Sequence, residues 1–346
     1  MQKNSQQRIA RLISVTAITG IGIALGLASH LSPAATQSVS SDTLAAAFTR
    51  QAPAIDGQAD ALWRRARPLV IEVTGGPNTN KQTLRMRALY DQENIYLLCQ
   101  WNDPTESLAR FPWEKQPDGS WKQLATNKED EQRFYEDKLA ILWPINAPSF
   151  VRSGCMTACH VGDGGKPFGN MFAPKGELLD LWHWKSLRTN SVVQADDQYL
   201  DDTPWSKETP IAGRKSDPLT SGGYKDNLNQ NKAAPAFMPA DKRPAPPYWI
   251  TSDAAIPFAD VFKPGDRVAP VIVSQFVGDR GDLRANGVWK NGQWTLEIAR
   301  RLVTGSQYDV QFQDLAAHYP FAPSIFDNAS VRHAFTSRVY RLAFAR

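Results

Sequence analysis

The sequence predicts a mainly β protein, an antiparallel β-sandwich with long loop insertions and a few short helices. The chain holds 11 Trp and 24 Pro among 346 residues, which favours sheets and irregular connections over helical bundles. Short apolar runs of alternating polarity recur, and two pairs of them are joined by turn sequences as hairpins. No regular strand–helix–strand pattern is visible, so a parallel α/β sheet is not expected.

Composition limits the class of protein. Hydrophobic residues make up 42% of the chain and charged residues 21%, as in ordinary folded globular proteins. The net charge is +4 and the charges are mixed along the chain, without the basic stripe of a nucleic-acid-binding protein. The three cysteines are too few for a disulfide framework.

The N-terminus has the order of an export signal. Lys3, Arg8 and Arg11 precede an apolar run at residues 12–27, and small residues follow. This order is typical of a signal peptide, although the run is a little short for a membrane span of about 20 residues. Residues 1–35 are therefore interpreted as a cleaved signal or an N-terminal anchor, which would place the body of the protein in the periplasm.

The rest of the chain is interpreted as a tether followed by one domain. Residues 36–53 are small and polar, and the domain is expected at 54–346. It opens with an Asp-Gly turn at 56–57. Asp60 is expected to cap a short helix that carries Trp63.

Four strands are expected in the first half of the domain. An apolar run at 69–73 predicts the first, and residues 84–91 and 95–101 predict a hairpin across a polar turn. Cys99 lies in the returning strand and is expected to be a buried core residue. The continuous apolar run at 139–145 predicts a further strand.

The second half contains the longest expected loop. Residues 178–185 predict a strand or a short helix, and the polar residues 195–247 are interpreted as a long insertion over the surface. A strand is expected at 267–273. The Asn-Gly sequence inside residues 289–294 is a strong hairpin signal. Further strands are expected at 295–300, 310–312 and 339–344.

The motif that indicates function is the pair of thiols followed by an imidazole at Cys155, Cys159 and His160. In the common haem-attachment signature C-x-x-C-H, the thiols bond to the haem vinyl groups and the His becomes an axial iron ligand. This chain has one more residue between the cysteines. Because haem is joined through thioethers in exported chains, the N-terminal signal and the motif support each other. We expect one covalent haem c.

Three other interpretations of this motif stay open. A structural zinc site usually needs four ligands, and Cys99 is the one other thiol, with no H-x3-5-H pair in the chain. A disulfide between Cys155 and Cys159 would close a very short loop and stabilise little. The cysteines could also be unrelated to the neighbouring His160, but neither this interpretation nor the disulfide accounts for the position of that residue directly after the second thiol.

Seven short motifs, each weak alone, occur in an order that is more specific. They are Ile55-Asp56-Gly57 with Trp63, Ala88-Leu89-Tyr90-Asp91, Trp101-Asn102-Asp103-Pro104-Thr105, Glu136-Asp137-Lys138, Leu181-Trp182-His183-Trp184-Lys185, Trp294-Thr295-Leu296-Glu297 and Phe326-Asp327-Asn328. Together they resemble the haem-binding domain of ethylbenzene-dehydrogenase-type and dimethyl-sulfide-dehydrogenase-type cytochrome subunits, a cytochrome c-552-like family. The resemblance extends from about residue 54 to the C-terminus.

The resemblance implies a β-sandwich that holds one haem, bound non-covalently by Met and Lys in the best-known members. The thiols of this chain then indicate a c-type branch with His160 as one axial ligand. The family's Lys ligand lies near the C-terminus, where this chain has His333, so His333 is the expected second ligand. Met171 is an alternative axial ligand, and His183 is an alternative ligand or a ring that packs against the haem. His318 is expected at the surface.

The function indicated by these features is electron transfer by a single-haem cytochrome that is not itself an enzyme. Expected partners are redox proteins, such as a membrane cytochrome b or subunits of a molybdenum oxidoreductase, and the N-terminal segment could tether the protein to the membrane. One alternative is a catalytic haem protein with an open sixth position. Another is a non-haem ligand-binding module on the same sandwich, for example for carbohydrate, with Trp113 or Trp121 as an exposed platform.

Overall fold

The computed structural model describes residues 41–124, 134–158 and 171–345. The expected signal segment 1–35, Cys159 and His160 lie outside these residues. Within the described ranges the chain forms 21 strands, one short α-helix and four short 3-10 helices. The mainly β class expected from the sequence is confirmed. No helix in the described part of the chain is long and apolar enough to cross a bilayer.

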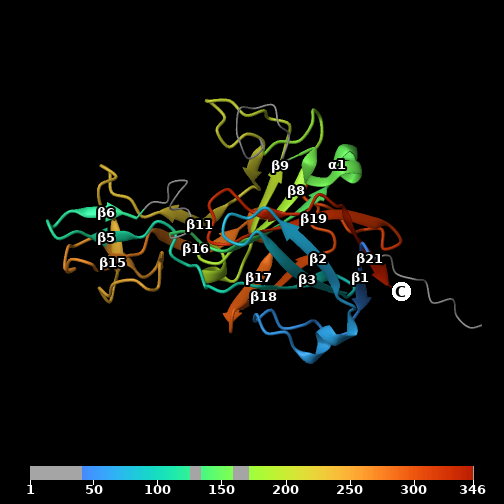
Figure 1. The fold of residues 1–346 in the computed structure, drawn as a ribbon, viewed down its shortest axis with the longest axis horizontal. Coiled ribbons are helices and arrows are strands. Elements are labelled where there is room, and N and C mark those ends of the chain that lie inside the picture. The colour runs from blue at the N-terminus through green and yellow to red at the C-terminus, as the bar shows by residue number, and fades with distance from the viewer. Residues whose placement is uncertain (1–40, 125–133, 159–170, 346) are drawn as a thin grey trace, which may run out of the picture. The chain divides into compact units, whose positions relative to one another are not determined.

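Thirteen strands form one large sheet. They are β1 (Thr43–Phe48), β2 (Leu69–Thr74), β3 (Lys81–Tyr90), β4 (Asn94–Asn102), β7 (Lys138–Pro144), β8 (Leu179–Lys185), β9 (Asp196–Leu200), β10 (Arg214–Ser216), β17 (Arg284–Lys290), β18 (Gln293–Arg301), β19 (His318–Phe326), β20 (Ala334–Phe335) and β21 (Tyr340–Ala345). The main path runs β10-β9-β8-β7-β19-β20-β2-β3-β4-β18-β17 (Figure 1). Neighbours on this path are antiparallel, whereas β1 pairs in parallel with β21 and β3.

Three smaller sheets and the helices complete the described chain. The small sheets are β11 (Ser221–Asp226) with β16 (Val271–Val277) and β13 (Trp249–Thr251), β12 (Phe237–Pro239) with β14 (Ala255–Pro257), and β15 (Arg267–Val268) with β5 (Trp113–Lys115) and β6 (Trp121–Gln123). The helices are α1 (Pro148–Ser153), η1 (Ala61–Arg65), η2 (Gly154–Met156), η3 (Asn190–Val192) and η4 (Asp279–Gly281).

The main core lies between two halves of the large sheet. Trp184 of β8 meets Trp101 of β4 with ring centroids 6.0 Å apart and Trp294 of β18 at 5.0 Å, both edge to face. All three indoles are buried. Because five strands lie between β8 and β4 along the sheet path, these contacts require the sheet to fold over on itself, and this gives the expected sandwich.

The local sequence signals are confirmed. The first expected hairpin is β3–β4, and the second is β17–β18, where Asn291 and Gly292 have φ of 53° and 78°. Two positive φ angles are typical of a type I′ turn. Asp60 caps η1 by accepting a hydrogen bond from Leu62 N at 2.7 Å. Cys99 is fully buried, and burial raises the pKa of its thiol to about 12.

Two expectations about irregular chain are wrong. The expected tether 36–53 contains β1, in which Leu44 and Ala46 are buried. Its apolar positions are mostly alanines, which have weak strand propensity, so the alternation gives a weak signal. The expected insertion 195–247 begins with β9, where Asp196 is buried because it pairs with Lys185 and Arg280. In sequence, a segment with paired and buried charged residues cannot be told from a polar surface loop.

The strand expected at 310–312 is also wrong. Val310 and Phe312 are buried, but their backbone amides bond to Asp180 Oδ2 at 2.9 Å and to Leu302 O at 2.8 Å, outside any strand ladder. The apolar residues at 310–312 therefore indicate that this segment is buried, and not that it pairs as a strand.

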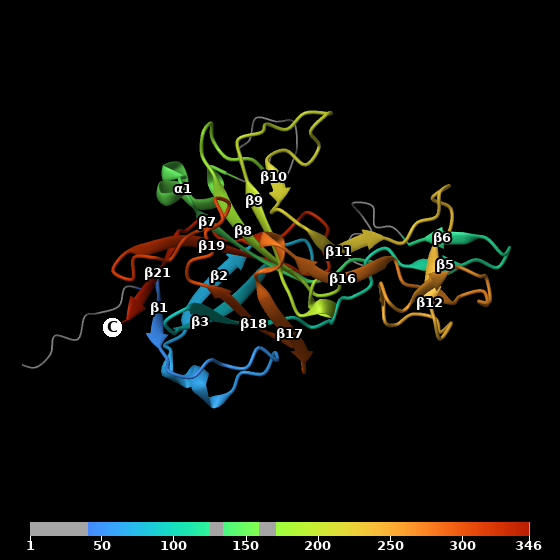
Figure 2. The same ribbon diagram turned by 180° about the vertical axis from the view of Figure 1, so that it is seen from behind.

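The face of β7, β8 and β9 that points away from the tryptophan core is also covered. It carries alternate strand residues such as Leu142, Leu181 and Leu200, which pack together with Phe150 of α1. Helix α1 begins with Pro148 in its first turn, a position where the fixed φ of proline suits a helix start. Figures 1 and 2 show α1 at the β7–β8–β9 end of the sheet. This helix leads directly into η2 and the thiol motif.

Candidate cofactor site

Cys155 lies in the apolar layer on this outer face. It belongs to η2, directly after α1, and is 4% exposed. The same cluster contains Ala158 and Ala173 on either side of the undescribed segment, together with Phe326 of β19. The first expected attachment residue therefore faces a flat, apolar stretch of sheet.

His183 of β8 faces the same side of the sheet and is buried. Its Nδ1 lies 3.1 Å from Gln198 Oε1, and its Nε2 has no hydrogen-bond partner among the described residues. Burial, followed by the charges of Lys185, Lys138 and Arg214, holds the pKa of His183 well below its usual value. The imidazole is therefore neutral. The amide oxygen of Gln198 assigns the proton to Nδ1, which leaves a lone pair on Nε2. Metal-binding histidines are commonly oriented in this way.

Phe326 brings the two expected His candidates into one ring cluster. Its ring centroid lies 5.6 Å from that of His183 and 4.6 Å from that of His333. His333 is half-buried, with Nδ1 3.0 Å from Val331 O. Met171 is half-buried and leads into Ala173 of the apolar cluster. His318 is exposed, as expected.

Lys138 is a residue of this site that sequence reasoning missed. Its Nζ donates to Ser330 O at 2.8 Å and lies 4.1 Å from the ring centroid of Phe326 and 4.7 Å from that of Tyr135. Burial lowers the pKa of Lys138 to about 7. The one sequence signal for its burial is that Lys138 shares the face of Ala140 at the start of β7. A lysine that flanks an apolar run usually lies at the surface, so this signal is weak.

Residues from several of the sequence motifs hydrogen-bond to one another and hold parts of the chain together. Glu297 Oε2 accepts hydrogen bonds from Asp56 N at 3.0 Å and Gly57 N at 2.9 Å, and Oε1 accepts one from Trp63 Nε1 at 2.6 Å. Gly57 has φ of 76°, and a Cβ there would lie 2.6 Å from Val288 Cγ2, so this tight turn requires glycine. These motifs hold the N-terminal segment against the sandwich.

A second convergence joins three more motifs. Asp137 accepts hydrogen bonds from Asn328 N at 2.8 Å, Ser107 N at 2.8 Å and Trp294 Nε1 at 3.1 Å. Carboxylate oxygens of Asp103, Asp137 and Asp327 lie within 4.8 Å of one another. Of their buried oxygens, only Asp103 Oδ2 lacks a hydrogen-bond partner among the described residues. Most of the buried carboxylate oxygens of these three aspartates therefore accept hydrogen bonds from neutral donors.

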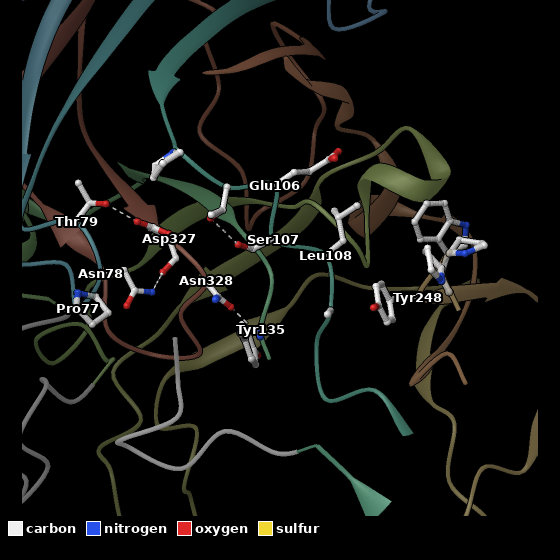
Figure 3. A pocket seen from close by; sticks show the side chains of 16 residues that line it. Pro77, Asn78, Thr79, Glu106, Ser107, Leu108, Tyr135, Tyr248, Asp327 and Asn328 are labelled. Carbon is white, nitrogen blue, oxygen red and sulfur yellow. Dashed lines mark hydrogen bonds between the residues drawn. The ribbon is translucent and has the colours of Figure 1, made fainter. Parts of the chain in front are cut away.

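A pocket of about 1030 Å³ opens beside these three aspartates, just above the range of about 300–1,000 Å³ that is usual for small-molecule sites. Figure 3 shows Thr79 and Asn78 pointing at Asp327 on one wall, with Tyr248 on the opposite side. The lining residues are Pro77, Asn78, Thr79, Pro104, Thr105, Glu106, Ser107, Leu108, Ala109, Tyr135, Pro246, Pro247, Tyr248, Trp249, Asp327 and Asn328.

The buried carboxyl groups at this pocket predict a pH-dependent stability. Burial and the charge of Asp327 raise the pKa of Asp103 to about 7, and burial and Asp103 raise the pKa of Asp137 well above its usual value. The folded chain then binds more protons than the unfolded chain between pH 4 and 7, so the free energy of unfolding falls as pH rises through this window.

Asp103→Asn is expected to reduce this loss, because the amide needs no proton and its oxygen can still accept from Thr105 N. We expect the difference in unfolding free energy between pH 5 and pH 8 to shrink by roughly 1–2 kcal/mol, since one pKa unit corresponds to about 1.4 kcal/mol. Urea denaturation at the two pH values measures it. Identical pH profiles for both proteins would contradict the expectation.

The tryptophan platforms expected for a carbohydrate module are not both available. Trp113 is 2% exposed and its Nε1 donates to Asn227 O at 2.8 Å, so it is a core residue of the small sheet and the expectation for it is wrong. Trp121 is half-buried and packs edge to face against Phe258 and Phe262.

The described fold defines the class of protein, an antiparallel β-sandwich domain. Residues 60–338 match the family model described as ethylbenzene dehydrogenase. The chain therefore belongs to the ethylbenzene dehydrogenase family, which confirms the family resemblance over most of the domain. No curated protein sequence matches the chain.

The solved structures that match the chain include carbohydrate-binding proteins. One is a family 9 carbohydrate-binding module from Caldicellulosiruptor kristjanssonii in complex with cellotriose, with 10% identity, 87% of this chain and 93% of that chain covered, and a TM-score of 0.32. Another is a putative carbohydrate-binding protein from Bacteroides uniformis, with 7% identity, 88% and 99% covered, and a TM-score of 0.33. Likeness at this level carries no argument about function.

Proposed function

We propose that this chain is an exported mono-haem c-type cytochrome that transfers electrons between partner redox proteins. One haem c would be attached through Cys155 and Cys159, with His160 as an axial ligand. Family membership supports the proposal, and so does the position of Cys155 on a covered apolar face that also carries a buried neutral imidazole. The haem supplies one-electron chemistry through its ferric and ferrous states.

The observation that carries the proposal is the buried Nε2 of His183, which has no partner among the described residues. A buried polar atom left without a hydrogen bond costs about 1–3 kcal/mol, and an iron ligand bond would remove this cost. We therefore place His183 ahead of His333 as the second axial ligand. His333 is half-buried, so its ring can be hydrated, and it stays an alternative together with Met171.

The chain's own residues would set the properties of the site. Gln198 orients His183, and Phe326 with the leucines of β7, β8 and β9 excludes water from that side. Two imidazole ligands would fill both axial positions, which suits electron transfer and not catalysis at an open iron. They would also give a lower reduction potential than a His/Met pair.

Location and partners belong to the same proposal. The export-type N-terminus at residues 1–35 would place the domain in the periplasm, free or tethered to the membrane by an uncleaved signal. Redox proteins there, such as a membrane cytochrome b or molybdenum oxidoreductase subunits, are the proposed partners. The protein would act as a carrier and not as an enzyme.

The test of attachment is a variant with both Cys155→Ser and Cys159→Ser. Haem staining of the denatured protein is expected to be strong for the unchanged chain and absent for the variant. Cys99→Ala is the matched control, because Cys99 is buried in β4 within the tryptophan core, and it is expected to stain fully. An unchanged chain that does not stain when matured in the periplasm would overturn the proposal.

A further inference from the structure

Five aspartates from five separate segments meet on the inner face of β8 and β9. Three of them, Asp180 of β8, Asp197 of β9 and Asp309 of the β18–β19 loop, have carboxylate oxygens within 4.8 Å of one another. Asp282 ends η4, and burial raises its pKa to about 6 against the neighbouring charge of Arg300, with Asp197 close enough to hydrogen-bond. Asp217 follows β10 and lies within hydrogen-bond reach of Asp309.

The burial of Asp217 is a second observation, separate from the short distances among the three clustered carboxylates. Asp217 is 2% exposed, and neither of its carboxylate oxygens accepts a hydrogen bond from a nitrogen or hydroxyl donor among the described residues. Burial, followed by the charges of Asp309 and Asp180, raises its pKa to about 9. A fourth buried carboxyl group therefore borders the cluster, within hydrogen-bond reach of Asp309 and without a nitrogen or hydroxyl donor among the described residues.

The unpartnered oxygens in this cluster are numerous. Within the described residues they are Asp180 Oδ1, Asp197 Oδ2, Asp282 Oδ1 and both carboxylate oxygens of Asp217 and of Asp309. Buried polar atoms are nearly always hydrogen-bonded in folded proteins, and several unsatisfied ones in one place indicate a missing ion or water.

The positive charge that the described structure brings here is Arg300. Its Nη1 lies 2.9 Å from Asp180 Oδ2 and 3.9 Å from Asp309 Oδ2. Asp180 Oδ2 also accepts from Val310 N at 2.9 Å and Trp182 Nε1 at 3.1 Å, so its capacity is filled and Oδ1 is left facing the cluster. One guanidinium cannot neutralise four buried carboxyl groups and the half-buried Asp282.

We propose that Asp180, Asp197, Asp217, Asp282 and Asp309 bind one calcium ion. Calcium takes six to eight oxygen ligands, often from several carboxylates in irregular arrangements. Magnesium prefers octahedral sites in which it keeps several waters. Zinc prefers nitrogen and sulfur ligands, and the cluster as described contains neither His nor Cys. The oxygen-only set therefore fits calcium.

The ion would join the β18–β19 loop and η4 to the strands, and it would add to the backbone hydrogen bond from Asp217 N to Asp197 O at 3.2 Å. It would hold the β18–β19 loop, the end of η4 and the chain after β10 onto β8 and β9. The β18–β19 loop places the apolar Val310 and Phe312 in the main core, so the fixed loop contributes to the sandwich itself. This inference does not depend on the proposed haem.

The test uses the full chain, freed of metal by a chelator, and calcium chloride as the probe. Isothermal titration is expected to show one tight calcium per chain. The melting temperature is expected to rise by roughly 5 °C when calcium reaches about a hundred times its Kd. Magnesium at the same concentration is expected to have a much smaller effect. A chain that binds no calcium and melts identically with calcium and with chelator would overturn the proposal.

Asp217→Asn separates a metal ligand from a purely structural residue. In chelator the variant is expected to be at least as stable as the unchanged chain, because the amide, unlike the carboxyl group of Asp217, needs no proton in order to be buried. In calcium it is expected to gain less stability and to bind calcium at least tenfold more weakly. Asp282→Asn is expected to behave in the same way and serves if the first variant does not fold.

Asp137→Asn is the matched control from the other buried carboxylate group. It is expected to keep the calcium affinity of the unchanged chain. Loss of calcium binding in Asp137→Asn with unchanged binding in Asp217→Asn would overturn the assignment and place the ion at Asp103, Asp137 and Asp327 instead.

Discussion

Replacing His183 with alanine is expected to leave the haem attached to the chain but to convert the ferric iron from a six-coordinate low-spin to a high-spin spectrum. The reason is that the proposed second ligand disappears while the thioethers and His160 stay. Added imidazole is expected to restore the low-spin spectrum, and carbon monoxide is expected to bind the reduced variant much faster than the unchanged protein. Absorbance spectroscopy measures all three effects.

His333→Ala is the matched control, because both imidazoles contact Phe326. It is expected to keep the low-spin spectrum and a low reduction potential. The reverse pattern, with His183→Ala unchanged and His333→Ala high-spin, would return the assignment to His333. A high potential with a sulfur-to-iron charge-transfer band in the unchanged protein would point to Met171 instead.

Glu297→Ala is expected to lower the free energy of unfolding by about 3–5 kcal/mol. The change removes the acceptor for Trp63 Nε1, Asp56 N and Gly57 N, and a buried donor left without a partner costs roughly 1–3 kcal/mol. Chemical denaturation followed by tryptophan fluorescence measures it. The haem spectrum of the folded protein is expected to stay unchanged, because Glu297 binds the N-terminal segment and does not contact the face of β7, β8 and β9 on which Cys155 and His183 lie.

Glu72→Ala provides the comparison on the surface. Glu72 pairs with Lys81 on the exposed face of β2 and β3, and both side chains are more than half exposed. Exposed ion pairs contribute between about 0 and 1 kcal/mol, so this variant is expected to unfold nearly as the unchanged chain does. An equally small effect for Glu297→Ala would contradict its role as a clamp.

The sequence predicts strands well where the signal is local. Alternation in β3 and β4 and the Asn291-Gly292 turn lie within a few residues, so the hairpins can be derived without knowing the rest of the fold. Prediction from the sequence fails where the burial of a residue depends on partners that are distant in the chain. Asp196 has the composition of a surface loop and is buried because Lys185 and Arg280 neutralise it.

The candidate sites show the same division. The thiol motif is contiguous and can be identified in the chain, whereas the state of His183 depends on Gln198 from the next strand and on coverage by Phe326. The aspartate cluster is harder still. Asp180 and Asp309 come from distant segments, and nothing local distinguishes them from aspartates in turns. The sandwich topology brings them together.

The covalent haem is the central claim, and a pyridine haemochrome spectrum of the purified chain tests it most directly. The spectrum is expected to show one haem per chain, with the band position of haem joined by two thioethers, and acid–acetone extraction is expected to leave the pigment with the protein. A spectrum of extractable haem, or no haem at all from cells that mature c-type cytochromes, would contradict the account.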